Sequence, residues 1–77
     1  MLAVHIEVLP KHGEWLVKLT WDAYIGPYSY DDAMITAVAL ADAAWQLGYD
    51  SSVVLEDLQG DRRTMWSHPE QRREAYA

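Results

Sequence analysis

Hydrophobic and polar residues alternate along two stretches near the start of the chain. One face of residues 2–9 is apolar and consists of Leu2, Val4, Ile6 and Val8. One face of residues 14–22 is apolar in the same way and consists of Trp15, Val17, Leu19 and Trp21. A period of two is typical of half-buried strands. Residues 10–13 between them contain Pro and Gly, which favour a turn, so the pattern predicts an antiparallel hairpin.

Residues 31–47 carry the one long helical pattern of the sequence. Ser29 or Asp31 can cap the start of this helix, where acidic side chains are favoured by the helix dipole. Gly48 is suited to the position just after the last turn. The pattern therefore predicts a helix that begins near Asp31 and ends at Leu47.

The predicted helix has a wide apolar arc. A stripe of bulky residues is expected to pack on the sheet: Met34, Val38, Ala41 and Trp45. A second set, which consists mostly of alanines, lies to one side of the stripe: Ala33, Ala37, Leu40, Ala44 and Leu47. Ile35 lies on the other side. Because one sheet face needs less apolar surface than this, the alanine-rich side is predicted to remain free for a second partner.

The rest of the chain is predicted from its turn residues and short apolar runs. Residues 22–30 are expected to form a loop around Gly26-Pro27, with the second strand ending at Ile25 at the latest. After a connector at residues 49–52, a third strand is expected over residues 53–58, and residues 59–61 favour a turn. Residues 62–66 could return as a fourth strand. Ser67 and Glu70 match a capping box, which predicts a short helix from about Pro69.

These elements predict an α+β fold in the order β-β-α-β, or β-β-α-β-β if the fourth strand forms. The sheet is expected to be antiparallel with three or four strands, and the long helix is expected to cover one of its faces. The six sheet residues expected against the helix stripe are Trp15, Val17, Leu19, Trp21, Val53 and Leu55. Residues 1–66 are predicted to form a single domain, and residues 67–77 either a short helix or a flexible tail.

Composition narrows the class of protein. The chain has 77 residues and no cysteine, which excludes disulfides and thiolate metal sites. The N-terminus lacks the features of a signal peptide and no apolar run is long enough to span a membrane, so a cytoplasmic protein is expected. Residues 1–59 hold nine acidic side chains and two lysines, a balance of −7, whereas residues 60–77 hold three acidic side chains and four arginines, a balance of +1. An acidic body disfavours sequence-independent binding of nucleic acid.

The sequence contains no motif that predicts catalysis. His5, His12 and His68 do not have the spacing of metal ligands. Asp31 and Asp32 are explained by the start of the helix, and no hydroxyl residue has a base placed beside it by the sequence. We therefore expect a non-catalytic protein without a metal or cofactor.

Two sets of residues are candidates for binding. The first is an interaction surface that combines aromatic residues near the predicted loop with the free side of the helix: Trp21, Tyr24, Tyr28, Tyr30, Ala37, Leu40, Ala44 and Leu47. Aromatic residues are enriched at protein interfaces, although these could also close the end of a small core. The leading hypothesis is an interaction module that forms a homodimer or binds another protein.

The second set consists of the arginines Arg62, Arg63, Arg72 and Arg73. They could bind an acidic partner, a small anionic ligand or a nucleic acid. The alternative is that they neutralise the acidic body of the protein, within one chain or across a subunit boundary.

The second strand, the helix and the last turn resemble a family of small bacterial β-β-α-β domains of unknown function. The resemblance covers residues 2–60 and depends on six positions: Gly13, Trp15, Val17, Lys18, Ala33 and Gly60. It implies the fold but no activity. The element order is also similar to that of antitoxin-type domains of the HicB sort, whose central strand motif is absent from this sequence.

Overall fold

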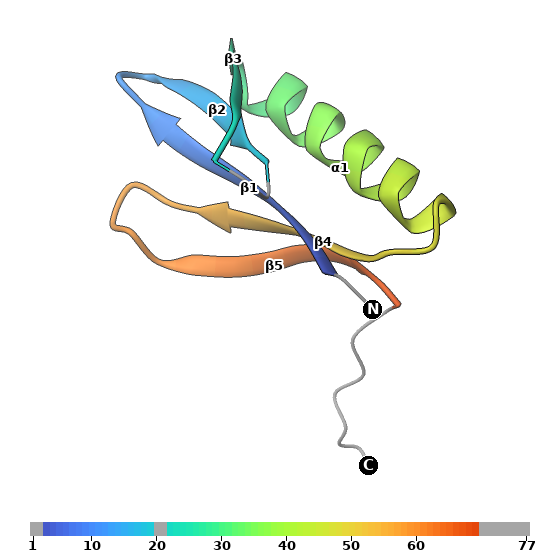
Figure 1. Ribbon diagram of the computed structural model, residues 1–77. Coiled ribbons are helices and arrows are strands. Elements are labelled where there is room, and N and C mark those ends of the chain that lie inside the picture. Colours follow the sequence, from blue (N-terminus) through green and yellow to red (C-terminus); the bar gives the residue numbers. More distant parts are fainter. Residues whose placement is uncertain (1–2, 20–21, 70–77) are drawn as a thin grey trace.

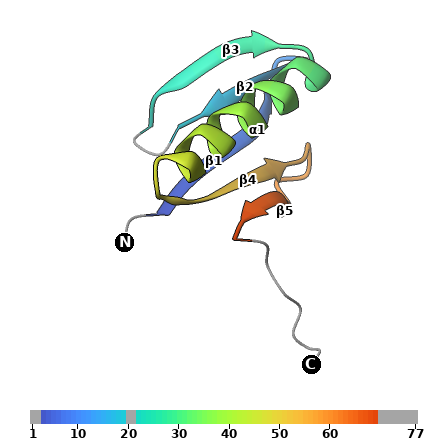
Figure 2. The same ribbon diagram turned by 90° about the vertical axis from the view of Figure 1, so that its right-hand side faces the viewer.

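The computed structural model describes residues 3–19 and 22–69. These residues form five strands and one helix in the order β1 (Ala3–Lys11), β2 (Glu14–Lys18), β3 (Tyr24–Tyr28), α1 (Tyr30–Gln46), β4 (Asp50–Glu56) and β5 (Arg62–His68). The strands make one sheet with the order β3-β2-β1-β4-β5, and α1 lies across one face of it (Figures 1 and 2). The α+β class and the single covering helix confirm the prediction.

The expectation of an antiparallel sheet with three or four strands is wrong. The sheet has five strands, and its central pair, β1 and β4, is parallel; the other neighbouring pairs are antiparallel. The parallel pair follows from the connection through α1, which carries the chain from β3 at one edge across the sheet to the free side of β1. Parallel neighbours need such a crossover, and a helix normally supplies it.

Residues 24–28 form a strand where the sequence predicted a loop. Gly26 has φ +119°, and a Cβ atom at this residue would lie 3.1 Å from the carbonyl oxygen of Trp15. The pairing of β2 with β3 shifts between Trp15 and Val17, at the same place. β3 is an edge strand, where Pro27 can be tolerated without an N–H group. Gly26-Pro27 therefore marks an irregular edge strand and not, as its composition predicted, the end of a strand.

The helix confirms its predicted limits to within one residue. The Ser29 side chain caps it by accepting a hydrogen bond from the backbone N–H of Asp32 at 3.2 Å. At the other end, the backbone N–H of Gly48, whose φ is +100°, donates to the carbonyl of Trp45 at 2.9 Å. This is the left-handed residue that commonly ends a helix.

The face of α1 that packs on the sheet matches the predicted stripe only in part: Ala41 is buried there, and Met34 and Val38 pack at the margin of the core. The buried helix residues are all alanines: Ala33, Ala37, Ala41 and Ala44. Met34 and Val38 are half-buried beside them, and Trp45 is exposed. The alanine-rich side is therefore covered by the sheet, and the bulky residues flank the contact. Small side chains let the helix backbone approach closely, as the 2.7 Å hydrogen bond from the Ser51 hydroxyl to the Ala41 carbonyl shows.

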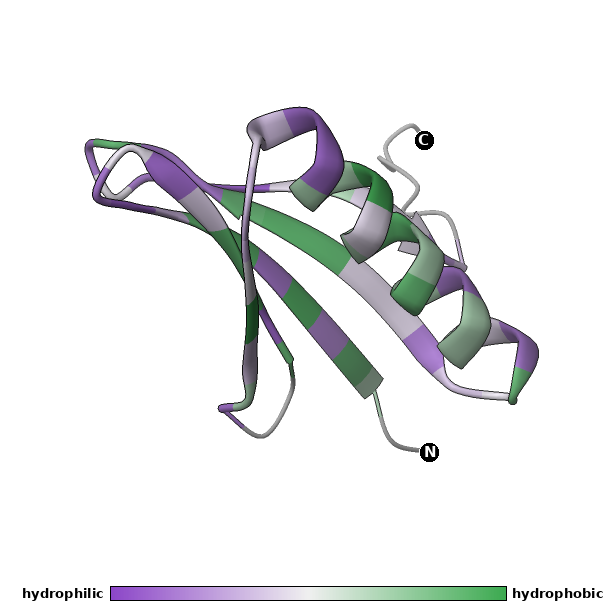
Figure 3. Cartoon of the chain, turned by 90° about the horizontal axis from the view of Figure 1, so that it is seen from above, coloured by the Kyte–Doolittle hydropathy of each residue, from purple (hydrophilic) through white to green (hydrophobic). Residues whose placement is uncertain are grey.

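The sheet contributes β-branched residues to this contact. Ile6 and Val8 of β1, Val17 of β2 and Val53 of β4 are buried against the alanines of α1. Alternating hydrophobic and polar positions along β1 are visible in Figure 3, which agrees with the period of two in the sequence. The apolar faces predicted for the first two strands are confirmed for the described residues.

The β4–β5 hairpin is longer than predicted. β4 begins at Asp50, within the predicted connector, and the fourth predicted strand forms and runs on to His68. The sequence does not predict Ser51 as a core residue, because its hydroxyl is polar. The residue is nevertheless only 4% exposed, and its hydroxyl donates a hydrogen bond to the Ala41 carbonyl. Ser67 lies in β5 and pairs with Ser52, so it is not in a loop before a helix. The helix predicted from Pro69 falls largely outside the described residues.

Candidate functional site

An apolar groove lies between α1 and β5. Its volume is about 570 Å³, and its lining consists of Met34, Ile35, Val38, Ala39, Asp42, Trp66 and His68. We call this the α1/β5 groove. It is wide open to solvent and offers mostly hydrocarbon surface, which is typical of a docking surface for a protein and less so of an enclosed pocket for a small molecule.

The packing of α1 explains why the groove is apolar. Because the alanines occupy the contact with the sheet, the larger side chains on one flank of the helix, Met34 and Val38, point along the sheet toward β5. Ile35 is turned further out and is 68% exposed. On the sheet side, Trp66 pairs with Val53 and packs at the margin of the core. The floor of the groove is therefore the outer edge of the hydrophobic core.

Two aromatic rings of the groove, those of Trp66 and His68, belong to a cluster that also includes Trp45. The His68 ring stacks on the Trp45 ring, with centroids 5.0 Å apart and planes at 24°. The same His68 ring meets the Trp66 ring edge to face at 4.7 Å and 82°. Aromatic pairs of this geometry stabilise contacts beyond the area that they bury. The stack links the last turn of α1 to the end of β5 and gives the groove a rigid wall.

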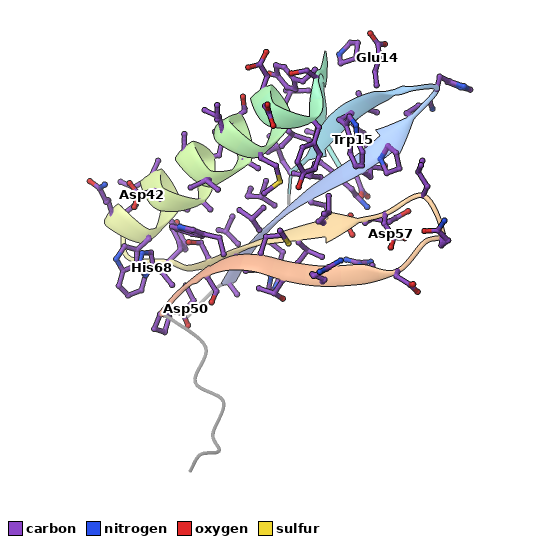
Figure 4. All side chains as sticks on the ribbon, turned by 180° about the vertical axis from the view of Figure 1, so that it is seen from behind. Glu14, Trp15, Asp42, Asp50, Asp57 and His68 are labelled. Carbon is purple, nitrogen blue, oxygen red and sulfur yellow. The ribbon has the colours of Figure 1, made fainter. Side chains whose placement is uncertain are left out.

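Acidic side chains lie at both ends of the β4–β5 hairpin. Asp42 lies near His68 at the end where β5 finishes, whereas Asp57 and the turn that precedes β5 lie at the opposite end of the hairpin (Figure 4). The Asp42 carboxylate accepts a hydrogen bond from the Gln46 side chain at 2.8 Å. Arg63 pairs with Leu55, whose side chain packs on the helix side of the sheet, so Arg63 is also on that side. Within residues 3–19 and 22–69, Arg63 makes no ion pair.

The structure does not bring the predicted aromatic surface together. Tyr24 is exposed beside Lys18, with the ammonium 5.9 Å from the ring centroid, on the sheet face that α1 leaves open. Tyr28 pairs with Trp15 and packs on the core, and Tyr30 meets Trp15 edge to face at 5.1 Å. The tyrosines are therefore divided between the two faces. Trp21 lies outside the described residues.

The helix residues of the predicted surface are also separated. Ala37 and Ala44 are buried between α1 and the sheet, and Leu40 is half-buried against the core. Leu47 is 78% exposed at the C-terminal cap. The prediction that the alanine-rich side is free is wrong, because a helix can bury its small residues against a sheet and leave large residues beside the contact.

Arg62 forms an ion pair with a carboxylate on the face of the sheet that α1 leaves open. The largely buried Glu7 side chain of β1 forms ion pairs with Arg62 and, at 3.9 Å, with Lys18. Lys18 also donates a hydrogen bond to Asp22 at 3.2 Å, and this contact, aided by Tyr24, raises the pKa of Lys18. For Arg62, the structure matches the neutralising alternative stated for the arginines. Arg72 and Arg73 lie outside the described residues.

The histidines show no metal-binding arrangement in the part of the chain that the structure describes. No group of three or more His, Asp or Glu side chains is close enough there to hold an ion. His5 lies with Nδ1 2.8 Å from the Ser52 hydroxyl, and His68 belongs to the aromatic stack. Within the same residues, no helix has the length and apolar character needed to cross a membrane.

The sequence contains a signal for the groove that the predictions above do not use. Alanines at positions 33, 37, 41 and 44 follow helical spacing and form a continuous small-residue stripe. Taking this stripe as the contact face places Met34, Ile35 and Val38 outside the helix–sheet contact. Their neighbour on the sheet, Trp66, could be identified only from the register of β4 and β5.

The fold and the groove define a small α+β domain with an open, apolar groove between its helix and one edge strand of its sheet. Searches with the chain find no matching protein family, no matching curated protein and no matching solved structure. The resemblance to small bacterial β-β-α-β domains therefore stays a prediction.

Proposed function

We propose that the protein is a non-catalytic interaction module that associates with a second copy of itself through the α1/β5 groove. The observation that carries the proposal is the exposure of large apolar residues in the groove. Ile35 is 68% exposed, and it lines the groove together with Met34, Val38 and Trp66. Contiguous apolar surface of this kind is typical of interaction sites, and single exposed residues are not.

Aromatic residues supply a second argument. Trp66 and His68 line the groove, and the His68 ring contacts the rings of both Trp66 and Trp45. Aromatic residues that are already held by such contacts lose little conformational entropy on binding, and aromatic residues dominate many interfaces. These rings favour another protein surface as the ligand.

The edge strand β5 adds backbone to this surface. It has a neighbour on one side only, so its outward edge is not paired with another strand among the described residues. Exposed sheet edges are common sites of association between chains. The other edge, β3, contains Pro27, which has no N–H group to donate to another strand, and this makes it the poorer partner.

Sedimentation velocity of the full chain across micromolar concentrations tests the proposal. The expected result is a concentration-dependent shift from monomer to dimer. Replacing Ile35 by Glu should weaken this association, since it places a charge in the groove at a helix position that tolerates Glu. The control is Leu58→Glu, at an equally exposed leucine in the turn between β4 and β5. A wild-type chain that stays monomeric throughout refutes the proposal.

A further inference from the structure

We infer that the two copies meet with their β5 strands antiparallel and that Arg63 of each copy pairs with Asp42 of the other. The inference rests on the proposed self-association and adds its geometry and the contact that specifies it. Two observations support it: Arg63, near the start of β5 on the helix side of the sheet, makes no ion pair within the described residues, and Asp42 lines the groove with His68 at the end of β5.

The area needed for a stable dimer brings β5 into the interface. A specific interface buries about 800 Å² per partner and involves roughly 20–30 residues on each side. The seven residues that line the groove cannot supply this alone. Trp66 and His68 of β5 line the groove, so the surface that continues it toward the sheet edge is that of β5.

A two-fold axis near the middle of β5 reverses one strand against the other. Met65 is the natural centre, because it is the middle residue of β5. The start of β5 in one copy then lies beside the end of β5 in the other, with Arg63 opposite Ser67. Neighbouring strands lie about 4.8 Å apart, a distance that an arginine side chain spans.

Charge complementarity selects this arrangement. Arg63 is exposed on the helix side of the sheet and has no carboxylate partner within the described residues. Asp42 lines the groove on the same side, near His68 at the end of β5. In the antiparallel arrangement each Arg63 reaches the Asp42 of the other copy, so the contact forms twice. A parallel arrangement instead places Arg63 beside Arg63.

The net negative charge of each copy makes the contact between Arg63 and Asp42 more important for association. Each copy has a formal charge of −6, so two copies repel one another at long range. Of the two arginines within the described residues, Arg62 is neutralised by Glu7 within its own chain. Arg63 is left to offset the repulsion at the interface.

Complementary charge reversals test the inference. Arg63→Asp sets two carboxylates against each other at both interface contacts, and Asp42→Arg sets two guanidinium groups against each other. Each variant alone should dimerise roughly tenfold or more weakly than the wild type. In an equimolar mixture the two variants can form a heterodimer, which has two contacts between positions 63 and 42. One contact joins the wild-type residues Arg63 and Asp42, and the other joins the two substituted residues. Both of these contacts join opposite charges, so the heterodimer should form with close to wild-type affinity. The double variant Arg63→Asp/Asp42→Arg should recover as a homodimer.

The control for net charge is Lys11→Asp, which makes the same charge change as Arg63→Asp at an exposed residue at the end of β1. Circular dichroism checks that each variant is folded. Recovery in the mixture and in the double variant supports the inference. Single variants that dimerise like the wild type overturn it and leave the proposed self-association standing. A wild-type chain that is monomeric at every concentration overturns both.

Discussion

Ala37→Leu tests whether the alanine-rich side of α1 packs on the sheet. Ala37 is fully buried among Val8, Val17 and the other residues of the core. An isobutyl group in place of its methyl group has no space there unless the helix moves away from the sheet. Overpacking of this kind costs about 1–3 kcal/mol. For a domain of this size each kcal/mol corresponds to a decrease of roughly 4–8 °C in Tm, so a shift of several degrees is expected.

The matched control is Ala43→Leu on the exposed side of the same helix. Alanine and leucine have similar helix propensities, so the difference between the two variants measures packing and not helix formation. Urea unfolding followed by tryptophan fluorescence gives both free energies of unfolding. The measurements are made at one protein concentration, since self-association would raise the apparent stability. If the two variants are equally stable, or if Ala37→Leu is neutral, the alanine face does not contact the sheet and the placement of the groove is wrong.

Three further outcomes are expected. Gly26→Ala should lower the free energy of unfolding by more than about 1 kcal/mol, because the residue has positive φ and its Cβ would meet the backbone of β2; thermal unfolding checks this. Ser51→Ala should cost about 1 kcal/mol in urea unfolding through loss of the buried hydrogen bond to the Ala41 carbonyl. NMR titration should give Lys18 a pKa above its ordinary 10.5. In Asp22→Asn the pKa of Lys18 should be lower than in the wild type, because the hydrogen bond to the Asp22 carboxylate is the main cause of the shift. Since that pKa is raised by folding, the associated stabilisation is present below pH 10.5 and is lost as the pH rises through the raised value.

The period of two in residues 3–19 and the caps of α1 could be predicted because they depend on neighbouring residues. The positions of Ile6 and Val17 on one face follow from strand geometry alone. The helix start follows from the Ser29 side chain, which acts within a single turn. In the same way, the Gly60 turn and the strand after it were predicted from local turn chemistry.

The parallel pairing of β1 with β4 could not be predicted, because it joins residues about fifty positions apart and the sequence does not state which strand edge the crossover reaches. Strand β3, residues 24–28, was predicted as a loop for a related reason. Gly26-Pro27 is unfavourable in the interior of a sheet, and only the tertiary structure shows that β3 lies at an edge.

The sequence by itself determined the elements of this protein: alternating strands, a capped helix rich in alanine and an acidic body with its arginines near the end. The tertiary structure decided which side of the helix is buried. Hydrophobicity favours Met34 and Val38 over alanine as contact residues, but close approach of a helix to a sheet of β-branched residues favours the smaller side chain. That choice leaves Ile35 exposed beside Trp66 and creates the α1/β5 groove. The candidate interaction surface therefore lies on the flank of α1 opposite to the one that the sequence pattern favoured.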